Sequence, residues 1–274
     1  MRLSLSVRVA ESFSNKRVVD IPLPDLAGIA GRAGFGALCM RASVVGVRSA
    51  PESVESARAL LQREGLAVSM VTGDFAVPEN GDEGPGCLRN ITPYLDLAQA
   101  LGSNLIRVCI KTGADIPFAR NSADEAAERN IRLAHQSHTL SLFETVEGSL
   151  NVLGQIGRSN FGLIYEPANL ALCGEDYGPE TLKTFQPYLF NVYLQNHAPH
   201  PDGDMPMSTW ANGTVTSILR PLDAAGGIDF GRVFEGLHAI SYSGYVTVHQ
   251  AFGGRLTPDE AATRSARFLK SFIV

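Results

Sequence analysis

The stretch FGLIYE, residues 161–166, runs through a short apolar segment and stops at a carboxylate. Three other segments in the second half of the chain have the same form: LSLFE (140–144), NVYLQNH (191–197) and YVTVH (245–249). Short apolar segments that stop at Glu, Gln or His are typical of buried parallel strands that deliver polar side chains to one rim. In an eight-stranded α/β barrel that rim carries the active site, so the pattern indicates an enzyme and leaves its substrate open.

Eight strands are predicted, and most are separated by about 20 to 35 residues, which is enough for one helix and two loops. Their predicted ranges are 3–9, 35–40, 66–71, 104–110, 139–144, 161–166, 190–196 and 245–249. Between them, apolar residues at spacings of three and four predict helices, two of which end at Gly65 and Gly102. The order of elements predicts a (β/α)8 TIM barrel, with residues 1–274 forming a single domain.

Composition excludes several classes of protein. A chain of 274 residues with 45% hydrophobic content is close to the size of one α/β barrel. Its net charge of -5, without a continuous basic stripe, argues against a nucleic-acid partner. The four cysteines are dispersed, which favours reduced thiols. No secretory signal or membrane-spanning segment is recognisable, so a cytoplasmic protein without membrane contact is expected. The oligomeric state stays open, a homo-oligomer included.

The interval between the seventh and eighth strands, residues 197–230, is longer than the others and rich in Pro, Gly, Asp and Asn. It predicts an extended loop beside the active rim, followed by a helix from about Asp229. Trp210 is either an apolar anchor of this loop over a ligand or a residue that packs the loop itself. A second loop is predicted after the third strand, at residues 74–86.

Side chains of a strand alternate between its two faces, and this alternation predicts which polar groups enter the barrel. The predicted inward set comprises Arg8, Arg41, Arg107, Lys111, Glu144, Glu166, Asn191, Tyr193, Gln195, His197 and His249. Its four Arg and Lys side chains exceed its two carboxylates by two, and a buried surplus of charge costs several kcal/mol unless it is compensated. A ligand with a carboxylate or a phosphate is therefore predicted. The alternative is that these cations pair with Glu11 and Asp74.

Glu144 and His249 form the predicted catalytic pair, because a carboxylate and an imidazole at neighbouring strand ends supply two groups of different basicity. The alternative is a buried ion pair that only holds the strands together. The predicted substrate-binding residues are Arg8, Arg41, Arg107, Lys111, Tyr193, Gln195 and His197. His135, His138 and His200 are predicted to be structural.

The strings LAQALGSNLIRV, GLIYEPANL, VYLQNH and GGIDFGRVFEGLHAISYSGYVTVH resemble successive segments of the xylose-isomerase-like TIM barrels. The resemblance covers roughly residues 60–272. Its most specific part is the last, where G-x-I-D-F precedes a helix and the eighth strand. The resemblance implies a sugar-like small-molecule substrate and one divalent metal, which can be Mn, Mg, Co or Zn.

Members of that family hold the metal through Glu, Asp, His and Glu at the ends of strands five to eight. Carried over to this sequence, the four positions fall on Glu144, Glu166, Tyr193 and His249, so only Glu144 retains the family's residue. The resemblance leaves two outcomes open. Glu144, Glu166 and His249 could bind a metal as a three-ligand site, to which Gln195 could add an oxygen. Otherwise the metal is lost and the cationic side chains replace it.

The function that the resemblance and the residues predict together is an isomerase or epimerase. It would act by proton transfer on a small polyhydroxy carbonyl compound, with Glu166, Gln195 and Arg107 orienting the substrate. The alternatives are a sugar-acid dehydratase, which needs the same base and an acid for the leaving hydroxyl, and a non-catalytic sugar-binding barrel that has lost its metal site.

Overall fold

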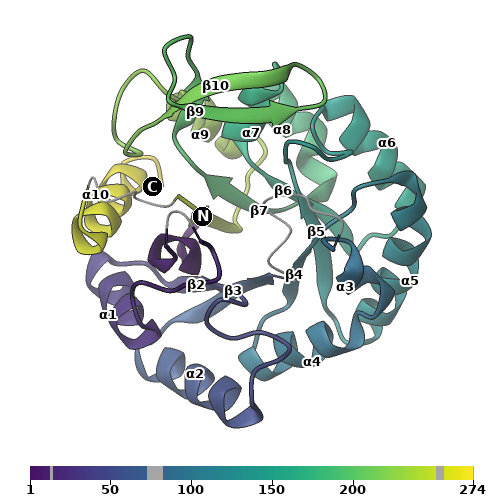
Figure 1. Cartoon of the computed structure of the whole chain (residues 1–274), viewed down its shortest axis with the longest axis vertical. Coiled ribbons are helices and arrows are strands. Elements are labelled where there is room, and N and C mark those ends of the chain that lie inside the picture. The colour runs from purple at the N-terminus through teal and green to yellow at the C-terminus, as the bar shows by residue number, and fades with distance from the viewer. Residues whose placement is uncertain (13–14, 73–82, 251–255, 274) are drawn as a thin grey trace.

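A closed parallel barrel is the central feature of the computed structural model, which describes residues 1–12, 15–72, 83–250 and 256–273. Within these ranges its strands follow one another in the order β1-β11-β7-β6-β5-β4-β3-β2 (Figure 1). They are β1 (Arg2–Ser6), β2 (Ala37–Met40), β3 (Ala67–Thr72), β4 (Leu105–Val108), β5 (Arg132–Gln136), β6 (Phe161–Tyr165), β7 (Leu189–Leu194) and β11 (Tyr245–Val248). The predicted (β/α)8 TIM barrel is confirmed.

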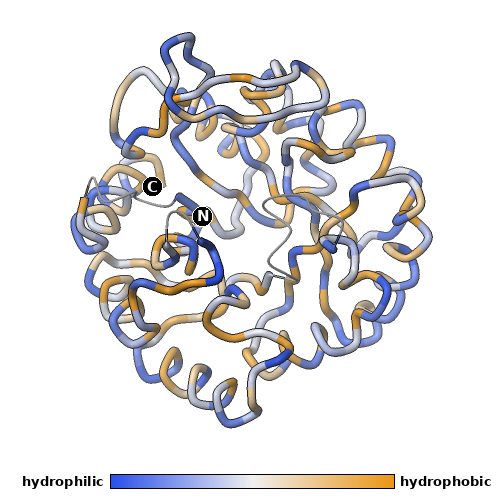
Figure 2. The backbone as a smooth tube through the Cα atoms, in the orientation of Figure 1, coloured by the Kyte–Doolittle hydropathy of each residue, from blue (hydrophilic) through white to orange (hydrophobic). Residues whose placement is uncertain are grey.

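Helices cover the outside of the barrel (Figure 1). The α-helices are α1 (Leu23–Ala33), α2 (Pro51–Arg63), α3 (Gly86–Arg89), α4 (Thr92–Leu101), α5 (Ile116–Glu128), α6 (Val146–Ile156), α7 (Pro167–Leu172), α8 (Pro179–Phe185), α9 (Phe230–Ala239) and α10 (Pro258–Lys270). Short 3-10 turns are η1 (Val7–Ala10), η2 (Gly113–Asp115) and η3 (Gln186–Tyr188). Gly65 and Gly102 follow α2 and α4 with φ of 69° and 74°, so both predicted helix ends are confirmed. Figure 2 shows hydrophobic and hydrophilic residues alternating along these helices, as expected where one face packs on a sheet.

The barrel interior is partly polar. A small apolar cluster fills its middle, made of Cys39, Met70, Leu105, Ala134, Ile164 and Tyr193. Polar side chains also form hydrogen bonds inside the barrel. The Ser4 and Ser69 hydroxyls lie 2.7 Å apart, and the Thr247 hydroxyl donates to the Asn191 side chain at 3.0 Å. Because side chains alternate along each strand, residues two positions beyond the cluster face the carboxyl-terminal opening, which we call the mouth.

The fifth strand lies elsewhere than predicted. It is formed by Arg132–Gln136, which pairs in parallel with β4 and β6, whereas residues 139–144 form turns. The prediction was wrong because RLAHQ neither is continuously apolar nor alternates: Leu133 and Ala134 are adjacent, and the inward face pairs Ala134 with the polar Gln136. The apolar LSLFE segment is buried for another reason: Phe143 stacks on His135 with ring centroids 4.1 Å apart.

The predicted loop between the seventh and eighth barrel strands is a three-stranded antiparallel sheet, which we call the cap sheet. Its strands are β8 (His197–Pro199), β9 (Met205–Thr209) and β10 (Gly213–Leu219), in the order β8-β10-β9. Pro, Gly and Asp concentrate between these strands, while MPMST and GTVTSIL alternate as strands do. Figure 1 shows β9 and β10 along the edge of the ring. The predicted helix from about Asp229 is confirmed, because Asp229 caps α9.

The other predicted loop, residues 74–86, falls mostly on residues 73–82, outside the described residues. Asp74, named as a partner for the inward cations, lies there too. No helix in the described part of the chain is long and apolar enough to cross a membrane.

Candidate active site

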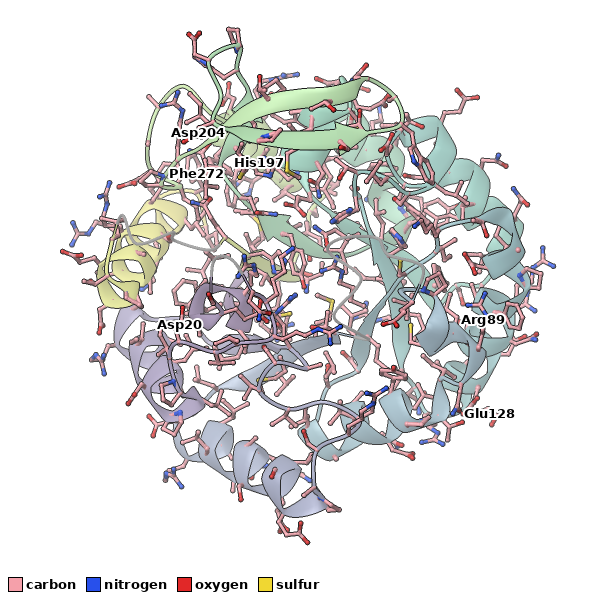
Figure 3. All side chains as sticks on the ribbon, in the orientation of Figure 1. Asp20, Arg89, Glu128, His197, Asp204 and Phe272 are labelled. Carbon is pink, nitrogen blue, oxygen red and sulfur yellow. The ribbon has the colours of Figure 1, made fainter. Side chains whose placement is uncertain are left out.

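A cavity of 230 Å³ opens at the mouth of the barrel. Barrel strand ends and adjoining loops contribute Arg8, Lys16, Gln136, His138, Asn169, Gln195 and His249. The cap sheet contributes His197, Met205, Met207 and Leu219, so a mostly apolar roof faces a polar floor. Figure 3 labels His197 at the point where the chain enters the cap sheet. Two larger hollows lie away from the mouth, one between α2 and α4 and one at the opposite end of the barrel.

Glu166 is the carboxylate of this site. It follows β6, precedes Pro167 at the start of α7 and is wholly buried. Its two oxygens accept hydrogen bonds from the side-chain amides of Gln136, Gln195 and Asn169, the last at 3.1 Å. Burial raises the pKa of Glu166 to about 8, although the Gln195 amide and the Arg107 charge favour the ionised form. A carboxyl with that pKa can both accept and release a proton near neutral pH.

His249 ends β11 and is held on two sides. Its Nδ1 lies 2.9 Å from the Ser6 hydroxyl, and its ring stacks on Tyr193 with centroids 3.9 Å apart. Burial lowers the pKa of His249 well below its usual value, and the positive charges of Arg41, Arg107 and Arg8 lower it further. The imidazole is therefore neutral, with one nitrogen committed to Ser6 and the ring fixed against Tyr193.

Arg107 lies under the mouth, and no described residue of the chain is a counter-ion in contact with it. Its side chain is fully buried, and none of its three guanidinium nitrogens has a hydrogen-bond partner. The guanidinium carbon sits 5.7 Å from the centre of the Tyr193 ring, whose hydroxyl lies 3.2 Å from the Cys39 sulfur. Burial lowers the pKa of Arg107, and Glu166 partly offsets this. Arg107 is not among the residues that line the cavity, but a buried guanidinium without a partner carries a desolvation cost that a nearby anion would offset.

The other predicted cations have different surroundings. Arg41 donates to Glu11 at 2.6 Å, and Arg8 lies 3.6 Å from the second oxygen of Glu11. The alternative of pairing with Glu11 is therefore confirmed for both, although Arg8 still lines the cavity. Lys111 is partly exposed and is not among the residues that line the cavity. The uncompensated cation of the predicted set is Arg107.

Glu144 is placed away from the cavity. Its carboxylate accepts hydrogen bonds from the backbone N–H groups of Leu140, Trp210 and Ala211, the last two at 2.8–2.9 Å. These contacts tie the turn between β9 and β10 to the barrel. His249 lines the cavity and Glu144 is not among its lining residues, so a catalytic role for the two together stays a prediction. Trp210 is 53% exposed, so its backbone and not its indole anchors the cap sheet.

The predicted metal ligands do not fit a metal ion. Among the described residues, no group of three or more His, Cys, Asp or Glu side chains could hold one. Glu144 is bound to the cap sheet, and amide donors occupy both oxygens of Glu166. The end of the fifth strand carries Gln136 where the resemblance implied a carboxylate. Arg107 adds a positive charge that a divalent cation would have to face.

Sequence reasoning missed several residues of the site. Gln136 had a signal, because it shares the inward face with Ala134 once the fifth strand is placed correctly. His138, predicted to be structural, follows that strand and lines the cavity. His197 was predicted and does line it; burial lowers its pKa to about 4, and its Nδ1 has no hydrogen-bond partner. Met205 and Met207 were not predicted as site residues, because the segment that forms the cap sheet was predicted to be a loop.

We expect replacement of Glu144 by Gln to loosen the cap sheet. The variant loses a charge that accepts several backbone hydrogen bonds, which costs about 1.5–3 kcal/mol for each charge-assisted bond. The expected result is a lower melting temperature and faster proteolysis near residues 209–213. Glu147→Gln, on the exposed face of α6, is the matched control. Unchanged stability together with lost turnover would return Glu144 to the catalytic role that the sequence predicted.

The architecture and the mouth define an α/β barrel with a small polar site at the strand ends. A family model described as xylose isomerase-like TIM barrel matches residues 29–272. The chain belongs to this family. No curated protein matches the chain.

Solved structures share the fold across nearly the whole chain. A probable 3-DHS dehydratase AsbF from Bacillus anthracis has a TM-score of 0.74 at 15% identity, covering 98% of this chain and 99% of that one. The D-allulose 3-epimerase from Methylomonas sp. in complex with D-allulose has 0.68 at 15%, covering 99% and 96%. A xylose isomerase-like TIM barrel protein from Mycobacterium smegmatis in complex with magnesium has 0.71 at 16%, covering 100% and 98%. At these identities the likeness establishes the fold alone.

Proposed function

We propose that this protein is an isomerase or epimerase that moves a proton on a small polyhydroxy carbonyl compound bound at the mouth. The observation that carries the proposal is Glu166, a buried carboxyl with a pKa of about 8 that lies directly behind Gln136, Asn169 and Gln195 of the cavity wall. At 230 Å³ the cavity is smaller than the pockets of about 300–1,000 Å³ that accept drug-sized ligands. Amides and imidazoles around it match a ligand rich in hydroxyl groups.

In the proposed reaction the ionised Glu166 takes a proton from the carbon next to the substrate carbonyl. The C–H electron pair forms a carbon–carbon double bond, and negative charge develops on the carbonyl oxygen. Arg107 lies close enough to Glu166 to influence its pKa, so it stabilises negative charge in this part of the site. In an isomerisation Glu166 returns this proton to the former carbonyl carbon, while the proton of the neighbouring hydroxyl moves to the former carbonyl oxygen and leaves a new carbonyl behind. In an epimerisation a water molecule protonates the first carbon from its opposite face, and Glu166 releases its own proton to solvent. The neutral His249 holds the substrate oxygen by hydrogen bonding.

A dehydratase is the second candidate, and one observation favours it. Because the pKa of Glu166 is about 8, this carboxyl is mostly protonated at pH 7 and can deliver a proton to a departing hydroxyl. Solved structures that share this fold include both a probable dehydratase and an epimerase. The products distinguish the two candidates: elimination releases water and leaves an unsaturated compound, whereas isomerisation preserves composition.

Proton exchange with solvent tests the proposal. The full-length protein is incubated in D2O with a panel of aldoses, ketoses and sugar acids, and carbon-bound hydrogen is followed by proton NMR. We expect at least one compound to exchange a hydrogen next to its carbonyl, and the exchange to persist in EDTA because the site residues do not fit a metal. A compound that binds while the whole panel stays unexchanged and unconverted would favour the non-catalytic sugar-binding barrel.

A further inference from the structure

A second hollow, of 450 Å³, lies at the amino-terminal end of the barrel, opposite the mouth. It is lined by the residues that open five strands: Arg2, Leu105, Arg132, Leu189 and Tyr245. The turn between α9 and β11 closes one side with Ser241, Tyr242 and Ser243. None of these residues contributes to the mouth cavity, so the hollow is a separate feature of the fold.

Two arginines face this hollow with their charges uncompensated. The Arg2 guanidinium lies 4.1 Å from the centre of the Tyr245 ring, and that of Arg132 lies 4.7 Å from the Phe190 ring. Stacking on a ring fixes the guanidinium plane and leaves its N–H edge available for a ligand. In the described chain neither side chain makes a hydrogen bond or an ion pair. Both also act electrostatically on Tyr242, so they border the same space.

The described residues that line this hollow include no acidic side chain. The chain as a whole has 28 acidic and 23 basic residues. Elsewhere, surface arginines pair with carboxylates, as in Arg158 with Asp124 and Arg264 with Asp223. Hydroxyl and amide donors surround the two arginines instead, including Ser69 and Asn104. Two preoriented guanidinium groups among neutral donors form a receptor for a multivalent anion.

We propose that this hollow binds a phosphate group through Arg2 and Arg132. A tetrahedral oxyanion has enough acceptor oxygens for two guanidinium edges and the neighbouring Ser241 and Ser243 hydroxyls. The phosphate is either free or part of a phosphomonoester, since the hollow has room for a small organic group. The site is independent of proton transfer at the mouth.

Isothermal titration of the full-length protein tests this proposal, with inorganic phosphate, ribose 5-phosphate and ribose as probes. We expect both phosphate compounds to bind and ribose not to bind. Tighter binding of ribose 5-phosphate would identify a phosphomonoester, and equal binding would identify free phosphate. Arg132→Gln is expected to weaken binding by about tenfold or more, because it removes a charged bidentate donor.

Arg158→Gln is the matched control, since it removes the same charge from a surface arginine paired with Asp124. Arg2→Gln provides a second variant on an exposed side chain, in case Arg132→Gln fails to fold. Equal affinities in Arg2→Gln and Arg158→Gln would overturn the proposal. So would the absence of phosphate binding at millimolar concentration, or a loss of binding that follows Arg8→Gln at the mouth.

Discussion

Glu166→Gln is expected to lower turnover by about 100- to 10,000-fold, the usual contribution of a positioned acid or base. Glutamine preserves the shape of the side chain but cannot exchange a proton with the substrate. The measurement is the rate of deuterium incorporation into whichever compound the wild-type protein exchanges. Glu147→Gln is the matched control, because it makes the same change at an exposed carboxylate of α6. Retained exchange in Glu166→Gln would remove this carboxyl from the mechanism.

The pH profile gives a second test of the same residue. With a pKa of about 8, about one-tenth of the Glu166 carboxyls are ionised at pH 7. If the ionised form is the base, the rate rises with pH through about 8 and then levels off. If the protonated form is the acid of a dehydratase, the rate falls over the same range. Glu166→Gln is expected to lose this pH dependence in either case.

Glu166 also predicts how stability depends on pH. Because its folded pKa of about 8 lies above the ordinary 4.5, the folded protein binds more protons than the unfolded chain between these values. The contribution of this group is complete below pH 4.5 and is lost as the pH rises through about 8. The melting temperature of the wild type is therefore expected to fall relative to that of Glu166→Gln between pH 5 and pH 8. Differential scanning calorimetry at both pH values measures this.

The fold was predictable because buried parallel strands appear in a sequence as short, mostly apolar segments. Phe161–Tyr165 and Tyr245–Val248 are mostly apolar, and both were predicted to within one residue of their observed ends. Arg132–Gln136 shows the limit of this signal. Its inward face pairs the apolar Ala134 with the polar Gln136, so the segment shows neither a continuous apolar run nor an alternation of apolar and polar residues. The position of this strand in the sheet is set by its pairing with β4 and β6. Such pairing joins segments that are distant in sequence, so the local pattern of residues does not reveal it.

The site was predictable in part for the same reason. Glu166, Gln195 and His249 follow strands that were placed correctly, and the structure brings all three to the mouth. Glu144 was assigned to the mouth because an apolar segment precedes it. Its carboxylate instead accepts hydrogen bonds from backbone N–H groups of the cap sheet, at Trp210 and Ala211. These residues lie about 65 positions further along the chain, so the sequence around Glu144 does not predict the contact.

Arg107→Met is expected to separate stability from ligand binding. Arg107 is a fully buried cation whose nitrogens have no hydrogen-bond partner, so the folded protein bears the cost of desolvating it. Methionine fills similar space without the charge. We expect the variant to be more stable by about 1–4 kcal/mol, as in other cases where apolar residues replace buried charges. We expect it also to lose the affinity for anionic ligands that the uncompensated charge provides.

A matched pair of ligands measures the second effect. Erythronate and erythritol share a four-carbon polyhydroxy skeleton and differ in one carboxylate. In the wild type erythronate should bind more tightly, and in Arg107→Met this preference should fall by about tenfold or more, since charge-assisted hydrogen bonds are lost. Arg41→Met is the control, because Arg41 has Glu11 as its partner, and breaking that pair destabilises the protein. Equal losses for the two ligands in Arg107→Met, or a drop in its stability, would show that Arg107 serves the fold and not the ligand.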